Sequence, residues 1–359
     1  MQIRYSCYYN STGYSVSAQD YILSLLKSQP DINVKLTAIN GFREREGIST
    51  DRHKVFQKLH ETTLRSEYIS VQHCIPRIYL SDTAKKRIGV SVFETIDPPN
   101  SWVSKMNEMD KIITASHFNK GSFQSNGVNK PVEVVPHCFD SGLFNKEVTP
   151  RGRYNLFTFL YIATWRERKN YIPLIKAFYD AFTTKDQVCL VLKTDKSIAL
   201  EDSINKIKNE EWKTKPTAPI FVEKKTLDFE EIPKFIKMAD VCINPSMGEG
   251  LGLLGLHSMA LGIPFITVRY GGCLEYSKPD YCTYINPSGY KKILNMDGLP
   301  QFQNKIWPNI QISEIKDKMI FEFKSFDHLK EKEKLAYYYV HQHFNYDIIG
   351  RRLLSTIGG

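Results

Sequence analysis

Short apolar runs alternate with helical patterns along most of this 359-residue chain, and this alternation constrains the fold more than any other feature of the sequence. Residues 15–27, for example, carry apolar side chains at the i, i+3, i+4, i+7 spacing of one helix face. Strands separated by helices need crossover connections, so the sequence predicts α/β domains built on parallel sheets. The expected strands cover residues 3–8, 34–38, 68–72, 88–93, 111–114, 132–135, 157–162, 188–193, 220–222, 241–244 and 264–267. The other expected helices cover residues 171–182, 229–238, 253–261 and a stretch from 329 that breaks near 343–345 and ends near 357.

The chain length predicts two domains, because roughly 150 residues are typical of one. A polar stretch at residues 139–155 interrupts the alternation and is expected to be a linker, after which the pattern restarts. We therefore expect an N-terminal domain over 1–145, a C-terminal domain over 146–342 and a closing helix over 343–359. Residues 286–330 show no clear period and are expected to form a surface excursion.

The composition is that of an ordinary globular protein, with 42% hydrophobic and 24% charged residues. No uncharged apolar run reaches the ~18 residues of a membrane-spanning helix. The N-terminus lacks the apolar region of a signal peptide, so we expect a cytoplasmic protein. The seven cysteines are scattered without a C-x-x-C pair, which predicts reduced, buried thiols and no metal site.

The formal net charge of +9 indicates an anionic partner: a phosphate compound, nucleic acid or an acidic membrane surface. No zinc finger, RNP-like aromatic motif or dense Lys/Arg run is present, so we expect no nucleic-acid partner. A basic cluster in the first part fits either a solvated face or a surface for an anionic membrane or acceptor. Its members are Arg43, Arg45, Arg52, His53 and Lys54.

Two loops carry residues suited to an anionic ligand. Gly13 follows the first expected strand and opens a helix, where free amides and a small residue favour an anion. A plain strand-to-helix turn explains this glycine equally well. Arg166, Arg168 and Lys169 follow the strand at 157–162, at the end of a strand where open α/β sheets bind ligands. They fit either phosphate oxygens or a solvated basic turn.

The segment 240–264 is the most informative part of the sequence. A buried strand runs into a loop with Gly248, Gly250 and Gly252, and a helix follows whose N-terminal amides point at that loop. Glu249 in this loop is suited to accept hydrogen bonds from sugar hydroxyls. His257, just over two helical turns later, is expected to line the same crevice. Taken singly, a helix cap and a packed imidazole are equally good interpretations of these two residues.

This segment resembles the Glu-x7-Glu region of family 4 glycosyltransferases, which are retaining enzymes. The matching residues are Pro245, Ser246, Glu249, Gly250, Gly252, Ala260, Gly262 and Pro264. Residues 12–14, 134–140, 161–170 and 271–275 resemble further motifs of the family. The resemblance implies the GT-B fold, in which two Rossmann-like parallel-sheet domains face an inter-domain cleft. The N-terminal domain is then the acceptor side, the C-terminal domain the nucleotide-sugar donor side, and the closing helix crosses back to the N-terminal domain.

The same resemblance implies roles for individual residues. The second glutamate of the family motif, which usually contacts the donor ribose, is His257 here. Arg166 or Arg168 is expected to replace the family's phosphate-binding arginine, with Arg168 preferred because it adjoins Lys169. The implied catalytic residues are Glu249, Lys169, Arg168 and Glu94. The implied donor-binding residues are Gly13, Arg166, Lys169, Gly248, Gly250, Leu251, Gly252, Leu253 and His257.

The function implied by the resemblance is sugar transfer with retention of configuration. The donor is expected to be a nucleotide-sugar, either a UDP- or a GDP-sugar, and the acceptor a glycan, a lipid or a protein-linked sugar. The family implies neither a cofactor nor a metal, because side-chain cations and amides hold the leaving diphosphate. The alternative is a GT-B protein that binds a sugar or nucleotide without turnover, suggested by the Glu-to-His difference at position 257. Contact with a membrane surface stays open.

Overall fold

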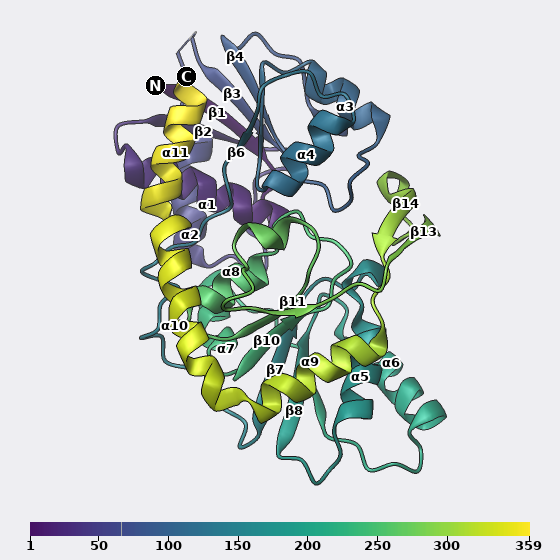
Figure 1. Cartoon of the computed structure of the whole chain (residues 1–359). Coiled ribbons are helices and arrows are strands. Elements are labelled where there is room, and N and C mark those ends of the chain that lie inside the picture. Colours follow the sequence, from purple (N-terminus) through teal and green to yellow (C-terminus); the bar gives the residue numbers. More distant parts are fainter. Residues whose placement is uncertain (66) are drawn as a thin grey trace. The chain divides into compact units, whose positions relative to one another are not determined.

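The computed structural model describes residues 1–65 and 67–359, and the side chains of these residues except 327–329. The chain divides into two compact units (Figure 1). The first unit contains Met1–Leu143, Thr226–Glu231 and His341–Gly359. The second contains Phe144–Lys225 and Ile232–Val340. A short segment from the middle of the chain and the chain end therefore belong with the N-terminal residues.

Six parallel strands form the sheet of the first unit in the order β2-β1-β3-β4-β5-β6. They are β1 (Gln2–Cys7), β2 (Asn33–Ala38), β3 (Ile69–His73), β4 (Lys86–Val90), β5 (Lys111–Thr114) and β6 (Val132–Val134). Its helices are α1 (Gly13–Ser28), α2 (Thr50–Glu61), α3 (Asn100–Asn107), α4 (His117–Ser125) and α11 (Tyr346–Gly358). All six expected strands are present. Helices α2, α3 and α4 were not among the expected elements.

The C-terminal helix α11 packs against α1, and the two lie side by side (Figure 1). Gly350 permits this close approach, since a Cβ at that position would lie 2.2 Å from the Ser24 carbonyl oxygen. At the start of α11, the Tyr346 hydroxyl donates a 2.5 Å hydrogen bond to Asp20 Oδ1. Arg52 Nη2 lies 3.0 Å from the same oxygen. Arg52 is thus buried in an ion pair, and the expectation that it forms part of a basic surface is wrong.

The second unit contains another sheet of six parallel strands, in the order β12-β11-β10-β7-β8-β9. They are β7 (Phe157–Ile162), β8 (Val188–Lys193), β9 (Ile220–Glu223), β10 (Val241–Asn244), β11 (Phe265–Val268) and β12 (Thr283–Ile285). The helices are α5 (Tyr171–Ala181), α6 (Ser197–Glu211), α7 (Ile232–Ile236), α8 (Leu253–Ala260), α9 (Ile312–Lys324) and α10 (Phe326–His343), of which residues 341–343 already belong to the first unit. Two parallel-sheet α/β units of this kind confirm the expected fold class.

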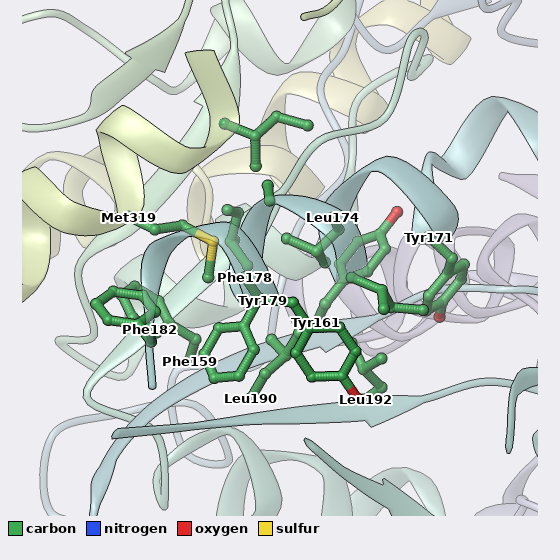
Figure 2. Close-up of a cluster of buried hydrophobic side chains, with 14 of the residues drawn as sticks. Phe159, Tyr161, Tyr171, Leu174, Phe178, Tyr179, Phe182, Leu190, Leu192 and Met319 are labelled. Carbon is green, nitrogen blue, oxygen red and sulfur yellow. The ribbon is translucent and has the colours of Figure 1, made fainter. Parts of the chain in front are cut away.

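The core of the second unit lies between its sheet and the helices α5 and α9. Figure 2 shows Phe159 from β7, Leu190 from β8, Phe178 from α5 and Met319 from α9 within one cluster. All four side chains are fully buried. Burial of each such side chain stabilises the fold by roughly 1.5–3 kcal/mol. This packing holds α5 over β7, and the loop that joins them carries Arg166, Arg168 and Lys169.

The expectations for two irregular segments need correction. Residues 286–330 contain an antiparallel hairpin, β13 (Tyr290–Asn295) and β14 (Gln303–Pro308), which stands out from the sheet (Figure 1). They also contain helix α9, whose Ile315 is fully buried, so this part is core rather than surface. The stretch 139–155 is not simply a linker, because Phe139 and Phe144 are fully buried. In residues 139–155 and in the hairpin, scattered apolar residues pack inward without a regular period, whereas those of α9 follow helical spacing.

Two expectations concerned the cysteines, as buried thiols, and the lack of a membrane-spanning segment. All seven cysteines are buried and free. Burial raises the pKa of the Cys74 thiol, for example, to about 12, so this thiol is protonated at neutral pH. In the described part of the chain, every helix is too short or too polar to cross a membrane.

Candidate donor-binding site

Two loops that follow neighbouring strands meet at one edge of the sheet in the second unit. Strands β7 and β10 pair in parallel, so their carboxyl ends lie at the same edge. The first loop contains a 3-10 helix, Glu167–Lys169, and the second is the glycine-rich loop before α8. The Met247 N–H donates to the Arg168 carbonyl at 2.8 Å, and Asn170 Nδ2 donates to the Pro245 carbonyl at 2.9 Å. These bonds fix the two loops to each other.

Lys169 and Glu249 form an ion pair between the two loops. Lys169 Nζ lies 2.5 Å from Glu249 Oε1, and the two side chains are only 11% and 14% exposed. Burial raises the pKa of Glu249. The charges of Lys169 and Arg168, with hydrogen bonds from Lys169 and Ser246, outweigh burial, and the pKa is lowered below its ordinary value of 4.5. Glu249 is therefore an ionised carboxylate at neutral pH.

Arg168 is bound into the same site, whereas Arg166 is exposed. Arg168 Nη1 donates to the Gly248 carbonyl at 3.1 Å, and its Nε lies 3.3 Å from Asp297 Oδ2. The site thus contains two cations, Arg168 and Lys169, and two carboxylates. Of the two arginines considered from the sequence, Arg168 is the one held beside Lys169.

The glycine-rich loop also contacts the loop after β11, which contains Gly272, and leaves no room for a side chain at that contact. The Gly272 N–H donates to the Glu249 carbonyl at 2.8 Å. A Cβ at Gly272 would lie 1.8 Å from the Gly250 carbonyl oxygen, so only glycine fits there. Gly252 has a φ of 90°, a conformation that favours glycine, and helix α8 begins at the next residue, Leu253. Leu251 in the same loop is buried, at 2% exposure.

His257 lies on α8 and is buried, at 4% exposure. Its ring stacks on Phe144, with ring centroids 4.1 Å apart and an interplanar angle of 24°. Burial lowers the pKa of His257 to about 3, so the imidazole is neutral at physiological pH. Where the family motif has a carboxylate, this chain therefore has a neutral ring. A contact between His257 and a donor stays a prediction.

Gly13 and Glu94, the other two residues expected at the site, belong to the first unit. Gly13 is the exposed first residue of α1 and follows the N-cap Thr12. Glu94 is half-buried in the loop after β4. Their roles toward a donor stay predictions, because the geometry described above belongs to the second unit alone.

The sequence interpretation missed two residues that contact the site. Asn244 Nδ2 donates to Glu249 Oε1 at 3.4 Å from the last position of β10. A polar residue at the carboxyl end of a buried strand was the available signal for it. Asp297 pairs with Arg168 from the loop between β13 and β14, and no sequence pattern in that region pointed to it.

Part of the second unit is similar to a known protein family. Residues 157–290 match the family model described as "Glycosyl transferases group 1". This segment runs from β7 to the start of β13 and includes Arg168, Lys169 and Glu249. No curated protein matches the sequence.

Solved structures match over more of the chain. HepE (Alr3699) of Anabaena, in a structure with UDP-glucose, is 13% identical, with a TM-score of 0.70 over 100% of this chain and 99% of that one. Sucrose-phosphate synthase from Thermosynechococcus elongatus is 11% identical, with a TM-score of 0.67 over 99% and 98%. The pneumococcal O-GlcNAc transferase GtfA, in a structure with UDP and GlcNAc, is 14% identical, with a TM-score of 0.57 over 81% and 56%. At these identities the likeness concerns the fold. The chain thus has the GT-B fold, and the segment that carries Lys169 and Glu249 is similar to group 1 glycosyltransferases.

Proposed function

We propose that the chain is a retaining glycosyltransferase that takes a sugar from a nucleotide-sugar donor. The observation that carries this proposal is the half-enclosed cluster of Arg168, Lys169 and Glu249 at the carboxyl edge of the second sheet. Cations beside an ionised carboxylate suit a ligand that joins a phosphate to a sugar. The similarity of residues 157–290 to group 1 glycosyltransferases supports the same assignment.

Transfer requires that the bond between the sugar C1 and the phosphate oxygen breaks while a bond to the acceptor oxygen forms. Negative charge then accumulates on the leaving diphosphate. We assign its stabilisation to Arg168, Lys169 and the amides at the start of α8, instead of a metal ion. In a retaining reaction the acceptor attacks from the face that the phosphate leaves, so the departing phosphate oxygen takes the acceptor proton.

Glu249 contributes an ionised carboxylate on the sugar side of this cluster. A carboxylate accepts hydrogen bonds from sugar hydroxyls and favours positive charge that develops on the sugar ring. Its ion pair with Lys169 holds it in place before the donor binds. We propose a UDP-sugar as donor, in line with the UDP and UDP-glucose of the Anabaena and pneumococcal structures, with a GDP-sugar as the other candidate. A glycan, a lipid or a protein-linked sugar is the proposed acceptor.

His257 favours a second candidate function, namely binding without turnover. The buried imidazole is neutral and stacks on Phe144, so it replaces a carboxylate by an uncharged ring. A protein of this kind binds the nucleotide or sugar but leaves the donor intact. The two candidates differ in whether the donor is consumed.

The test combines a thermal-shift screen of nucleotide-sugars with a turnover assay on the donor that binds. A true donor raises the melting temperature as its concentration exceeds the Kd. We expect donor hydrolysis or transfer by the wild type, and a loss of at least about 100-fold in Lys169→Ala and Glu249→Gln. Lys185→Ala is the matched control, because Lys185 is exposed and lies just before β8, away from the carboxyl edge of the sheet.

Each outcome separates the candidates. Turnover that both site variants abolish supports the enzyme, and the anomeric configuration of the product, read by NMR, tests retention. Activity that survives EDTA supports charge neutralisation by side chains. Binding without turnover supports the second candidate. If no nucleotide-sugar binds, both proposals are wrong.

A further inference from the structure

The β13–β14 hairpin reaches the candidate donor site through the loop between its strands. Several of its side chains anchor it in the second unit: Met296 and Trp307 are fully buried, and Phe302 is 3% exposed. The Phe302 and Trp307 rings pack edge to face, with centroids 5.3 Å apart. The loop between the strands is therefore held in a defined place.

Asp297, in this loop, binds Arg168 at two points. Its Oδ1 accepts a hydrogen bond from the Arg168 main-chain N–H at 3.2 Å, and its Oδ2 lies 3.3 Å from Arg168 Nε. The side chain of Asp297 is fully buried, and that of Arg168 is 13% exposed. A buried carboxylate needs a cation beside it, so this pairing is specific.

The backbone at Asp297 is in the left-handed region, with a φ of 58°. Aspartate adopts this conformation more readily than most residues, but it still has a cost. In this conformation the Asp297 carboxylate lies beside Arg168. The Phe302 ring adds a further contact, because Arg168 Cζ lies 5.6 Å from its centroid.

Asp297 has two conceivable effects on a phosphate ligand: it either competes for Arg168 or orients it. The carboxylate contacts Nε and the main-chain N–H, which are the inner atoms of the residue. A phosphate is expected to approach the terminal nitrogens of the guanidinium. Asp297 on one side, Phe302 on the face and the Gly248 carbonyl at Nη1 together restrict a side chain that otherwise has many rotamers.

We propose that Asp297 is a positioning residue that orients the Arg168 guanidinium for the diphosphate of the donor. The hairpin then contributes a positioning residue to the donor site. This inference rests on the proposed function, since it assigns Asp297 a task toward a nucleotide ligand. Asp297 and the β13–β14 hairpin lie outside the motifs on which the proposed function rests.

The experiment is a double-mutant cycle on the full chain, with UDP as the calorimetric probe. Asp297→Asn keeps the size and tolerates the left-handed backbone, whereas Asp297→Gly keeps the backbone and removes the side chain. We expect either change to raise the Kd for UDP about tenfold. In an Arg168→Ala background, the same changes alter the Kd by less than about twofold, because Asp297 acts through Arg168. Asn304→Gly is the matched control, since Asn304 is an exposed residue of the same hairpin with a φ of 57°.

A second measurement works without any nucleotide. The NMR signal of the Arg168 main-chain N–H, which donates to Asp297 Oδ1, is expected to shift, and its exchange with water to accelerate, in Asp297→Gly and not in Asn304→Gly. If wild-type protein binds neither UDP nor GDP, the proposed function is contradicted while this measurement still tests the pairing; if it binds GDP alone, GDP replaces UDP as the probe in the cycle. If wild type binds UDP, then tighter binding by Asp297→Asn, additive effects in the cycle or an unchanged Arg168 signal each overturn the inference.

Discussion

A buried glutamate in helix α9 permits a quantitative prediction about stability. Glu322 is 1% exposed, and its Oε2 has no hydrogen-bond partner among the described residues. Burial raises the pKa of Glu322 from 4.5 to about 7, although a hydrogen bond with the Thr283 side chain and the charge of Lys332 partly oppose this. The perturbation is Glu322→Gln, which keeps the shape of the neutral acid and cannot ionise.

The sign follows from proton linkage. Between pH 4.5 and about 7 the folded state keeps a proton that the unfolded state has lost, so wild-type stability falls as the pH rises through this window. At about 1.4 kcal/mol for each unit of pKa difference, ionisation costs the folded state about 1 kcal/mol at pH 5 and about 3 kcal/mol at pH 8. Glutamine removes that cost. The gain in unfolding free energy from Glu322→Gln should therefore be about 2 kcal/mol larger at pH 8 than at pH 5.

Urea unfolding at the two pH values, followed by tryptophan fluorescence, measures this difference. Three of the four tryptophans, Trp165, Trp212 and Trp307, lie in the second unit together with Glu322, so the signal reports mainly on that unit. A change in packing caused by the amide contributes equally at both pH values and cancels in the comparison. Glu331→Gln is the control, because it makes the same chemical change at an exposed position. An effect of Glu322→Gln that is the same at pH 5 and pH 8 would refute the reasoning.

Three further predictions concern the site and the packing within each unit. Because the pKa of Glu249 is lowered below 4.5, its pairing with Lys169 should stabilise the protein fully above that pH and progressively less as the pH falls below it. Urea unfolding of Glu249→Gln against wild type from pH 3 to 7 measures this, and a difference in unfolding free energy that stays the same over the whole range contradicts it. Gly272→Ala should lower the unfolding free energy by at least about 2 kcal/mol, since its Cβ meets the Gly250 carbonyl, and thermal unfolding near that of wild type would show that the loops yield. Gly350→Ala should separate α11 from α1, seen as faster hydrogen exchange in both helices, and unchanged protection would contradict the contact described above.

Much of the fold could be predicted from local pattern. Strands β5, β7, β8 and β10 have the bounds expected from their apolar runs, because a strand buried in a parallel sheet is apolar almost throughout. Helix α1 could be predicted because its apolar residues repeat with the helical period, although the structure buries residues 15–22 without a break. The same pattern places the glycine-rich loop after β10, so the neighbourhood of Glu249 followed from order along the chain.

Helix α9 and the hairpin were not among the expected elements. The buried Ile315 and Met319 of α9, with the partly buried Ile320, follow helical spacing, so this period was present and was overlooked beside the irregular residues that precede it. Arg52 was expected on a surface because charged residues are usually exposed. Its burial depends on Asp20, 32 residues earlier in the chain. Partners this distant in sequence leave no local signal.

The sequence by itself determined the kind of fold and the edge of the sheet at which Arg168, Lys169 and Glu249 gather. Apolar periodicity and the position of loops relative to strands are local properties, and both are visible in the order of residues. Only the tertiary structure decided which cation is held in place: Arg168 pairs with Asp297, 129 residues away, while Arg166 is exposed. It also decided that His257 is buried against Phe144. Pairing and burial of this kind depend on which segments meet in space, since the charge of a residue and the pKa of a ring are set by neighbours that the local sequence does not contain.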